Sequence, residues 1–157
     1  MIESESQPIA VRDMTPADAP EVARLIAMLG HQATADVIAE RIVAFLANGE
    51  RGLVAVRQLP GNASPILGIV TLHITPVLHR SGPVGRLTAL VVDEAVRGRG
   101  VGRALVEAAE AIFVARGCVL VEVTSNKRLS EAHAFYEKLG YMSTSLRFGK
   151  PLSRCPG

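Results

Sequence analysis

Residues 96–102 read Val96-Arg97-Gly98-Arg99-Gly100-Val101-Gly102. They follow an apolar, β-branched run at 87–92 and precede a helical pattern at 103–116. This order predicts a strand, a short glycine-rich turn and the start of a helix. Backbone N–H groups at such a turn lie at the positive end of the helix, a favourable place for a phosphate. We therefore expect a phosphate-binding turn, and Arg97 and Arg99 strengthen that expectation.

Length and composition are those of one folded domain. The chain has 157 residues, of which 48% are hydrophobic and 20% charged, so a disordered chain is excluded. We expect a single domain over residues 8–150, with flexible tails at 1–7 and 151–157. The net charge of +2 is too small to indicate a nucleic-acid partner. Without a signal peptide or a stretch of spanning length, we expect a cytoplasmic protein with no membrane partner.

The two cysteines carry no recognisable chemistry. Cys118 begins an apolar run, which predicts a buried thiol, and Cys155 lies in the tail. Neither has a partner at a spacing typical of metal or redox sites, so we predict no metal and assign neither cysteine a role.

Periodicity and turn residues predict ten elements in the order β-α-α-β-β-β-α-β-α-β. Thr15 is expected to cap the first helix, with Pro16 in its first turn and Asp18 reaching back to the cap. The expected strands are 9–12, 53–56, 66–74, 84–93 and 118–124, followed by one strand or a pair of strands over 141–148. The expected helices are 15–30, 35–48, 101–116 and 130–139.

The order of elements also predicts the sheet. A helix between strands 84–93 and 118–124 implies a parallel crossover, whereas the three strands before it form an antiparallel meander. Strand 118–124 is apolar on both faces and is therefore expected to be central. The predicted fold class is α/β (α+β), with a mixed six- to seven-stranded sheet covered by helices on both faces.

Three motifs then resemble one family. Leu90-Val91-Val92-Asp93, followed by Arg97-x-x-Gly100-x-Gly102, is similar to the acetyl-CoA motif of the GNAT acetyltransferases. The segment Ala134-Phe135-Tyr136-Glu137-Lys138-Leu139-Gly140-Tyr141 resembles a second motif of that superfamily, and Asn126 lies between the two. The resemblance covers residues 8–149 and implies a GNAT-like fold.

Other phosphate-binding motifs fit less well. A P-loop requires a lysine and a hydroxyl residue that this turn lacks. A dinucleotide-binding fingerprint requires an acidic residue about twenty positions onward, and Glu122 leaves that alternative open. The glycines could also form only a tight turn, although three glycines alternating with two arginines exceed what a turn needs.

The resemblance implies acetyl-CoA as co-substrate and a set of residues that hold it. In the family the pantetheine arm lies along the fourth strand, here beside Leu90 and Val92, and the pyrophosphate reaches the glycine turn. The implied donor-binding residues are Leu90, Val91, Val92, Arg97, Gly98, Arg99, Gly100, Val101, Gly102, Arg103, Asn126 and Tyr136. Asn126 has the alternative role of capping the turn before the last helix.

Tyr136 is the candidate general acid. A phenol, with an ordinary pKa of about 10, can donate a proton to the leaving thiolate. Phe135 and Tyr136 point about 100° apart on a helix, so one can pack inward while the other faces a cleft. The alternative is that Tyr136 is only a packed aromatic residue.

The general base is less evident. Many relatives carry a carboxylate on the fourth strand, whereas this chain reads Arg86-Leu87-Thr88-Ala89-Leu90. Glu122 is the predicted replacement, because a carboxylate within an apolar strand needs a partner, such as His133 or an arginine. His73 and His79 are alternatives that would act through water.

The resemblance implies an N-acetyltransferase that moves acetyl from acetyl-CoA to a primary amine by direct attack. The acceptor, a small molecule or a peptide, would lie between residues 30–32 and 143–148. Arg80 or Arg147 could hold a carboxylate of the acceptor, the alternative being that both arginines are solvated surface residues. A homodimer is also compatible with the family. The alternatives are a non-catalytic, CoA-binding regulatory module and a nucleotide-binding protein.

Overall fold

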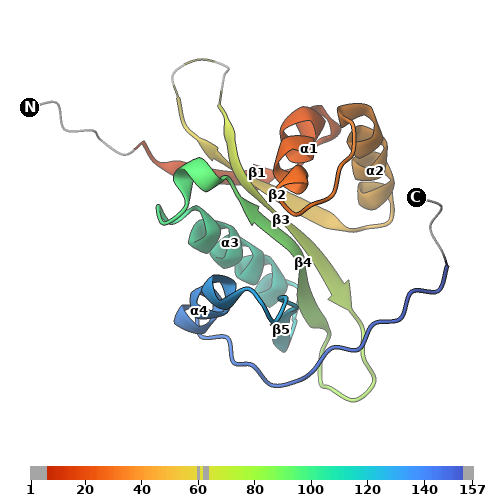
Figure 1. Ribbon diagram of the computed structural model, residues 1–157. Coiled ribbons are helices and arrows are strands. Elements are labelled where there is room, and N and C mark those ends of the chain that lie inside the picture. The colour runs from red at the N-terminus through yellow and green to blue at the C-terminus, as the bar shows by residue number, and fades with distance from the viewer. Residues whose placement is uncertain (1–6, 60, 62–63, 154–157) are drawn as a thin grey trace, which may run out of the picture. The chain divides into compact units, whose positions relative to one another are not determined.

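The computed structural model describes residues 7–59, 61 and 64–153. These residues belong to two compact units, Met1–Val123 and Thr124–Gly157. In the described residues, the first unit contains one sheet and three α-helices, and the second contains one α-helix (Figure 1). The single domain over 8–150 stays a prediction. None of the described helices is long and apolar enough to cross a membrane.

The element order agrees with the sequence up to the last helix. The elements are β1 (Ile9–Asp13), α1 (Ala19–Ala27), α2 (Ala35–Ala47), β2 (Arg51–Arg57), β3 (Ile66–Thr75), β4 (Val84–Val92), α3 (Val101–Ala115), β5 (Leu120–Val123) and, in the second unit, α4 (Ser130–Lys138). The chain enters α1 through a short 3-10 helix, Pro16–Asp18. There Asp18 Oδ2 accepts a hydrogen bond from the Thr15 N–H at 2.8 Å, which confirms the predicted cap.

The strands lie in the sheet in the order β1-β2-β3-β4-β5, which is also their order along the chain. The first four are antiparallel to their neighbours, and β5 runs parallel to β4. The predicted meander and the crossover through α3 are therefore confirmed. The central position predicted for β5 is wrong: among the described residues β5 pairs with β4 alone, and the side chains of Leu120 and Glu122 are exposed.

The sheet has five strands, fewer than the six to seven predicted. The expected strand at 141–148 is absent from the described residues, which adopt no regular structure there. Its large apolar side chains, Met142, Leu146 and Phe148, are exposed. A strand is stable only when a neighbouring strand pairs with it, and a local stretch of sequence does not supply that neighbour.

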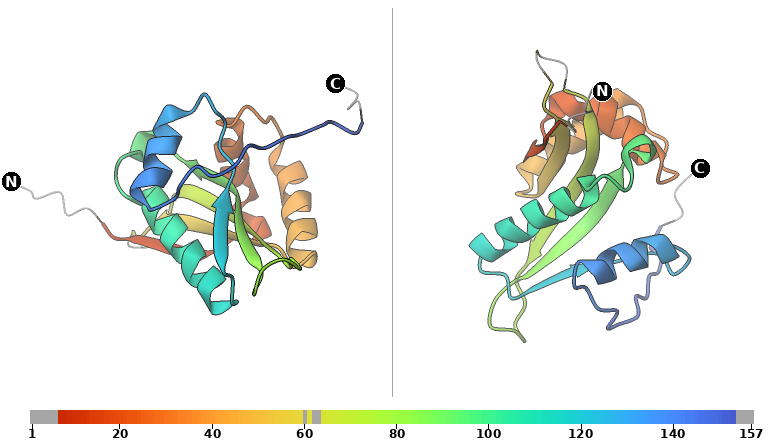
Figure 2. Two further views of the ribbon diagram at one scale, coloured as in Figure 1. Left: turned by 90° about the horizontal axis from the view of Figure 1, so that it is seen from below. Right: turned by 90° about the vertical axis from the view of Figure 1, so that its left-hand side faces the viewer.

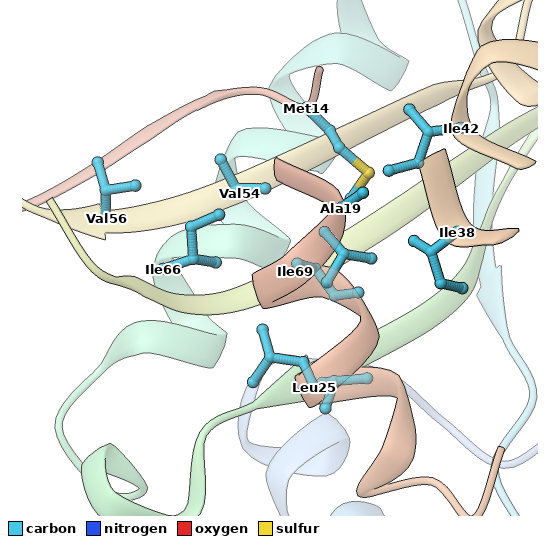
Figure 3. Packing of buried hydrophobic residues seen from close by; sticks show 11 residues of the cluster. Met14, Ala19, Leu25, Ile38, Ile42, Val54, Val56, Ile66 and Ile69 are labelled. Atoms are coloured by element: carbon cyan, nitrogen blue, oxygen red, sulfur yellow. The ribbon is translucent and has the colours of Figure 1, made fainter. Parts of the chain in front are cut away.

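Helices cover both faces of the sheet in the first unit, as predicted: α1 and α2 lie on one face and α3 on the other (Figure 2). A buried cluster joins α1 and α2 to the sheet, including Leu25, Ile38, Val54 and Ile69 (Figure 3). On the opposite face, the ring of Phe113 from α3 is fully buried against β4 at Gly85. Apolar burial of this kind, at about 25 cal/mol per Å², is the main force that holds the helices to the sheet.

Candidate active site

The glycine turn leads directly into α3. Gly98 and Gly100 have positive φ values of 76° and 84°, which a residue with a Cβ rarely adopts. The first helical hydrogen bond at this end runs from the Ala104 N–H to the Gly100 carbonyl, at 3.0 Å. The N–H groups of residues 98–103 have no acceptor within the described part of the chain. They form a cluster of unpaired donors at the positive end of a 15-residue helix.

Asp93 anchors the start of this turn. Its carboxylate accepts hydrogen bonds from the Ala95 N–H at 3.0 Å and from Arg24 of α1 at 2.8 Å. These two hydrogen bonds, that of Ala95 first, lower the pKa of Asp93 below its ordinary value. The turn is thus held from both sides, since Arg24 comes from a helix 69 residues earlier in the chain.

The arginines of the turn are exposed cations with weak local partners. Arg97 Nη2 lies 3.9 Å from Glu94 Oε1, and Arg103 Nε lies 2.8 Å from Glu107 Oε1. Exposed pairs of this kind contribute little to stability, so these cations can turn to an anionic ligand at small cost. Arg99 is exposed in the same turn.

β4 separates from β5 on the way to the turn. The parallel pairing joins Val84 through Leu87 to Leu120 through Val123 and ends there. From Ala89 to Val92, β4 pairs with β3 on one side and with no strand of the described chain on the other. Alternate backbone groups of this segment, which includes Leu90, Val91 and Val92, are therefore open to an extended ligand.

A bulge lies where the two strands separate. Thr71 pairs with Ala89 and Leu72 with Leu87, so Thr88 is an extra residue in β4. The hydroxyl oxygens of Thr71 and Thr88 lie 2.7 Å apart. A bulge redirects the side chains that follow it, and this one lies beside the free segment of β4.

Four ionisable residues form a row across the sheet beyond the bulge. His73 of β3 pairs in register with Arg86 of β4, and Arg86 pairs with Glu122 of β5. Glu50, just before β2, adds a contact to His73, with 2.6 Å between Oε1 and Nδ1. Residues directly opposite in a sheet share a face, so this charged row, Glu50–His73–Arg86–Glu122, lies on one face.

Glu122 differs from its prediction in one respect. Its side chain is 52% exposed rather than buried, because β5 is the edge strand. An arginine lies near it, which was one of the two partners predicted: Arg86 Nη1 is 4.0 Å from Glu122 Oε1. Its role as general base stays a prediction.

The second unit carries Asn126 and Tyr136. Asn126 Oδ1 accepts a hydrogen bond from the Arg128 N–H at 3.0 Å, so the side chain caps the turn before α4. The Asn126 carbonyl lies 2.9 Å from His133 Nε2, which places His133 in the same local network. The role of Asn126 in donor binding stays a prediction.

Tyr136 is packed between two aromatic rings. Its ring centre lies 5.2 Å from that of Phe135 and 5.7 Å from that of Tyr141, both edge to face. Burial raises the pKa of Tyr136 above the ordinary value of a phenol. The hydroxyl therefore keeps its proton at neutral pH, as a proton donor must. It has no hydrogen-bond partner within the described part of the chain.

The remaining candidates are spread over exposed segments. His79 and Arg80 are exposed in the loop between β3 and β4, and Arg147 is exposed in the second unit. Cys118 is a half-buried free thiol whose pKa is raised by burial. Cys155 lies outside the described residues.

The residues of the turn and of β4 fit acetyl-CoA, the acetyl donor that the motif predicts. The cluster of unpaired N–H groups can hold a pyrophosphate, and the free edge of β4 can pair with the amides of an extended arm. A Cβ added at Gly98 or Gly100 would meet nothing within 4 Å and would project into the open space beside these donors.

A family model agrees with this geometry. The model of the acetyltransferase (GNAT) family matches residues 22–141, which include the turn, the free segment of β4 and α4. This chain belongs to the GNAT acetyltransferase family. It is an N-acetyltransferase, and acetyl-CoA is its acetyl donor.

Individual relatives agree with the family match. The acetyltransferase is 33% identical over 87 residues to aminoalkylphosphonate N-acetyltransferase of Salmonella typhimurium, an alignment that spans 55% of this chain and 56% of that protein. It is 32% identical to glucosamine 6-phosphate N-acetyltransferase of Trypanosoma brucei brucei, over 73% of this chain and 78% of that protein.

A solved structure also resembles this acetyltransferase. The crystal structure of a Trypanosoma brucei acetyltransferase superimposes with a TM-score of 0.77 at 26% identity, over 92% of this chain and 100% of that chain.

Two residues of this site were not predicted from the sequence. Glu50 was missed because it precedes its strand by one residue and meets His73 only through the register of β2 and β3. Thr88 was noted only for not being an acid, since threonine fits a regular strand and an ordinary strand pattern does not reveal a bulge.

Proposed function

We propose that this acetyltransferase acetylates the primary amine of a small molecule by direct attack, without an acetylated protein intermediate. The observation that carries the proposal is the separation of β4 from β5 after Leu87, on a strand that runs on into the glycine turn. A donor held at the turn and along Leu90, Val91 and Val92 would bring its reactive end to Thr88. An acceptor on the face of the charged row can then reach that end.

The chain's own groups suggest the binding roles. Unpaired N–H groups in the turn, with exposed arginines beside them, hold the pyrophosphate. The residues concerned are Arg97, Gly98, Arg99, Gly100, Val101, Gly102 and Arg103. Acetyl-CoA supplies a thioester, whose carbonyl carbon an uncharged amine can attack. Asn126 is proposed as a further donor-binding residue, through the amide nitrogen that its capping contact leaves unused.

Tyr136 is the proposed general acid. Its hydroxyl has no partner in the described chain, and burial keeps it protonated at neutral pH. It would donate its proton to the sulfur as the carbon–sulfur bond breaks. The proton of the amine has two candidate acceptors on the charged row, Glu122 and His73, which lie on opposite sides of Arg86.

The names of the curated relatives favour a small acceptor. They acetylate, by name, an aminoalkylphosphonate and glucosamine 6-phosphate, each an amine with a phosphorus oxyanion. The charged row offers groups of both signs for such a molecule. A homodimer and a cytoplasmic location stay predictions; light scattering and fractionation test them.

Release of free CoA thiol tests the function. Purified protein is given acetyl-CoA and a panel of aminoalkylphosphonates, amino sugars with and without phosphate, polyamines and short peptides. We expect turnover with a small primary amine and a kcat about a hundredfold lower for Tyr136→Phe, with an unchanged KM for acetyl-CoA. Tyr141→Phe, which removes a neighbouring hydroxyl, is the matched control and retains a kcat near that of the wild type.

Two results would count against this proposal. Turnover only with peptides would reject the small-molecule acceptor. Tight binding of acetyl-CoA without turnover on any amine, unaffected by Tyr136→Phe, would favour a CoA-binding regulatory module.

A further inference from the structure

The charged row lies on the sheet face that carries α1 and α2. Ile69 of β3 belongs to the buried cluster on that face, and His73 follows it by four residues on the same strand. Side chains alternate along a strand, so residues four apart point the same way. His73 is nevertheless half-exposed, so this end of the face is open to solvent.

The bulge brings Arg86 to the same face. Without an extra residue in β4, strict alternation from Val91 would place Leu87 on the face of α1 and α2 and Arg86 under α3. With Thr88 inserted, Leu87 pairs with Leu72 and is buried, while Arg86 pairs with His73 and is half-exposed. Thr71, whose hydroxyl meets Thr88, precedes His73 by two residues, or about 7 Å along the strand. His73 is therefore within reach, directly or through one water, of an amine bound at the bulge.

Glu50 fixes the ring of His73. The 2.6 Å contact joins Glu50 Oε1 to Nδ1, and the Glu50 side chain is only 23% exposed. A carboxylate cannot donate, so Nδ1 carries the hydrogen and Nε2 keeps its lone pair in a neutral ring. Nε2 has no hydrogen-bond partner within the described part of the chain. The pair thus presents an oriented and unoccupied proton acceptor.

Glu122, on the other side of Arg86, is held less firmly. Its side chain is 52% exposed, and 4.0 Å separates Glu122 Oε1 from Nη1 of the Arg86 guanidinium. This distance exceeds that of a hydrogen bond. Imidazole is also the side chain whose ordinary pKa lies nearest neutral pH, which suits a general base. Along the row, the charged groups that flank His73 are Glu50 on one side and Arg86, followed by Glu122, on the other.

We propose that His73 is the catalytic base for the acceptor amine and that Glu50 is the positioning residue that orients it. This inference rests on the proposed direct transfer at the same site. As the nitrogen–carbon bond forms and the carbon–sulfur bond breaks, the ammonium acceptor loses two protons in all. His73 Nε2 takes one and passes it to solvent, and the equivalent of the other protonates the departing sulfur.

The first test measures the ring itself and needs no substrate. Nitrogen-15 spectra of the free protein, with imidazole labelled, report which ring nitrogen carries the hydrogen. We expect the Nδ1–H form for His73 in the wild type and in Glu50→Gln, whose amide oxygen can still accept. In Glu50→Ala we expect the Nε2–H form to gain population. A wild-type ring in the Nε2–H form overturns the proposal, whether or not an acceptor has been found.

The second test is the pH profile of kcat/KM for the amine. We expect a rise across the range in which an imidazole loses its proton, and a loss of that rise in His73→Gln with kcat lowered about a hundredfold. Glu50→Gln should retain the tautomer and with it the pH-dependent rise, because its amide oxygen can still accept the hydrogen bond from Nδ1. The KM for acetyl-CoA should not change in either variant.

Glu122→Gln is the matched control, since it removes the carboxylate on the other side of Arg86. If His73→Gln retains the wild-type pH profile and Glu122→Gln loses it, Glu122 is the base and the proposal fails while the acetyl-transfer function stands. If the wild type transfers no acetyl group to any amine, the proposed function fails, and the tautomer measurement still decides whether Glu50 orients His73. Thermal melts of each variant separate lost chemistry from lost folding.

Discussion

Gly98 and Gly100 in the turn and Gly68 and Gly85 in the sheet occur for opposite reasons. A Cβ on either turn glycine would meet nothing within 4 Å, but both residues have positive φ. A Cβ on Gly85 would come within 2.5 Å of the Phe113 ring, and one on Gly68 within 2.8 Å of the Val91 carbonyl oxygen. The sheet glycines let α3 pack closely, whereas the turn glycines keep space open at its N-terminus. The same residue type thus positions the helix in one region and leaves room for a ligand in the other.

The largest effect is expected at Gly85. Gly85→Ala forces the fully buried Phe113 ring to move and should lower the free energy of unfolding by about 3 kcal/mol. Urea unfolding followed by circular dichroism measures this change. In a protein that already carries Phe113→Leu, Gly85→Ala should lower the free energy of unfolding by a smaller amount. If Gly85→Ala is as stable as the wild type, close packing is not the reason for this glycine.

Gly68→Ala should have the next largest effect on stability. The added Cβ meets a backbone oxygen at 2.8 Å and Leu105 Cδ1 at 3.1 Å, so a flexible side chain cannot relieve all of the overlap. We expect a loss of about 2 kcal/mol in the free energy of unfolding, with little change in the KM for acetyl-CoA of the folded fraction. A rise in this KM with no loss of stability would contradict the distinction between sheet glycines, which serve packing, and turn glycines, which leave room for a ligand.

Gly100→Ala should change binding more than folding. The positive φ costs about 1 kcal/mol for a residue with a Cβ, and the methyl group fills space beside the unpaired N–H groups. We expect the Kd for CoA, measured by calorimetry, to rise about tenfold, or about 1.4 kcal/mol. Gly117→Ala is the matched control: its φ is 75° with nothing within 4 Å, and it follows the other end of α3. It should lose similar stability and bind CoA normally.

Asp93 should give the smallest effect, one that depends on pH. Its pKa is lowered in the folded protein, so its contribution to stability is complete above the ordinary aspartate pKa of about 4 and is lost as the pH falls through the lower, folded value. Asp93→Ala, which removes the cap of the turn, should destabilise the protein by about 1 kcal/mol at pH 7. The difference from the wild type should shrink in melts below about pH 4. A constant difference down to pH 2 would show that the charge is not responsible.

The sequence correctly predicted features that depend on residues close together in the chain. It failed for features that depend on contacts between distant segments. Thr15 and Asp18 form the predicted cap because the hydrogen bond spans three residues. Residues 120–123 form the predicted strand, but at the edge, because an apolar run shows that burial is favourable without showing which segment provides it. The contact of Glu50 with His73 spans 23 residues and depends on strand register. Periodicity cannot reveal such a contact. The sequence therefore indicated His73 as an alternative general base but not Glu50 as its partner.

The bulge at Thr88 has a consequence for the comparison of related chains. One extra residue in β4 moves Arg86 from the face of α3 to the face of the charged row, whereas two extra residues would restore the original alternation. Insertions and deletions at this point therefore act by parity: an odd number exchanges the side chains that a substrate meets, and an even number leaves them in place. Two homologues with identical residues on either side of position 88 can thus differ in specificity through a single gap in their alignment.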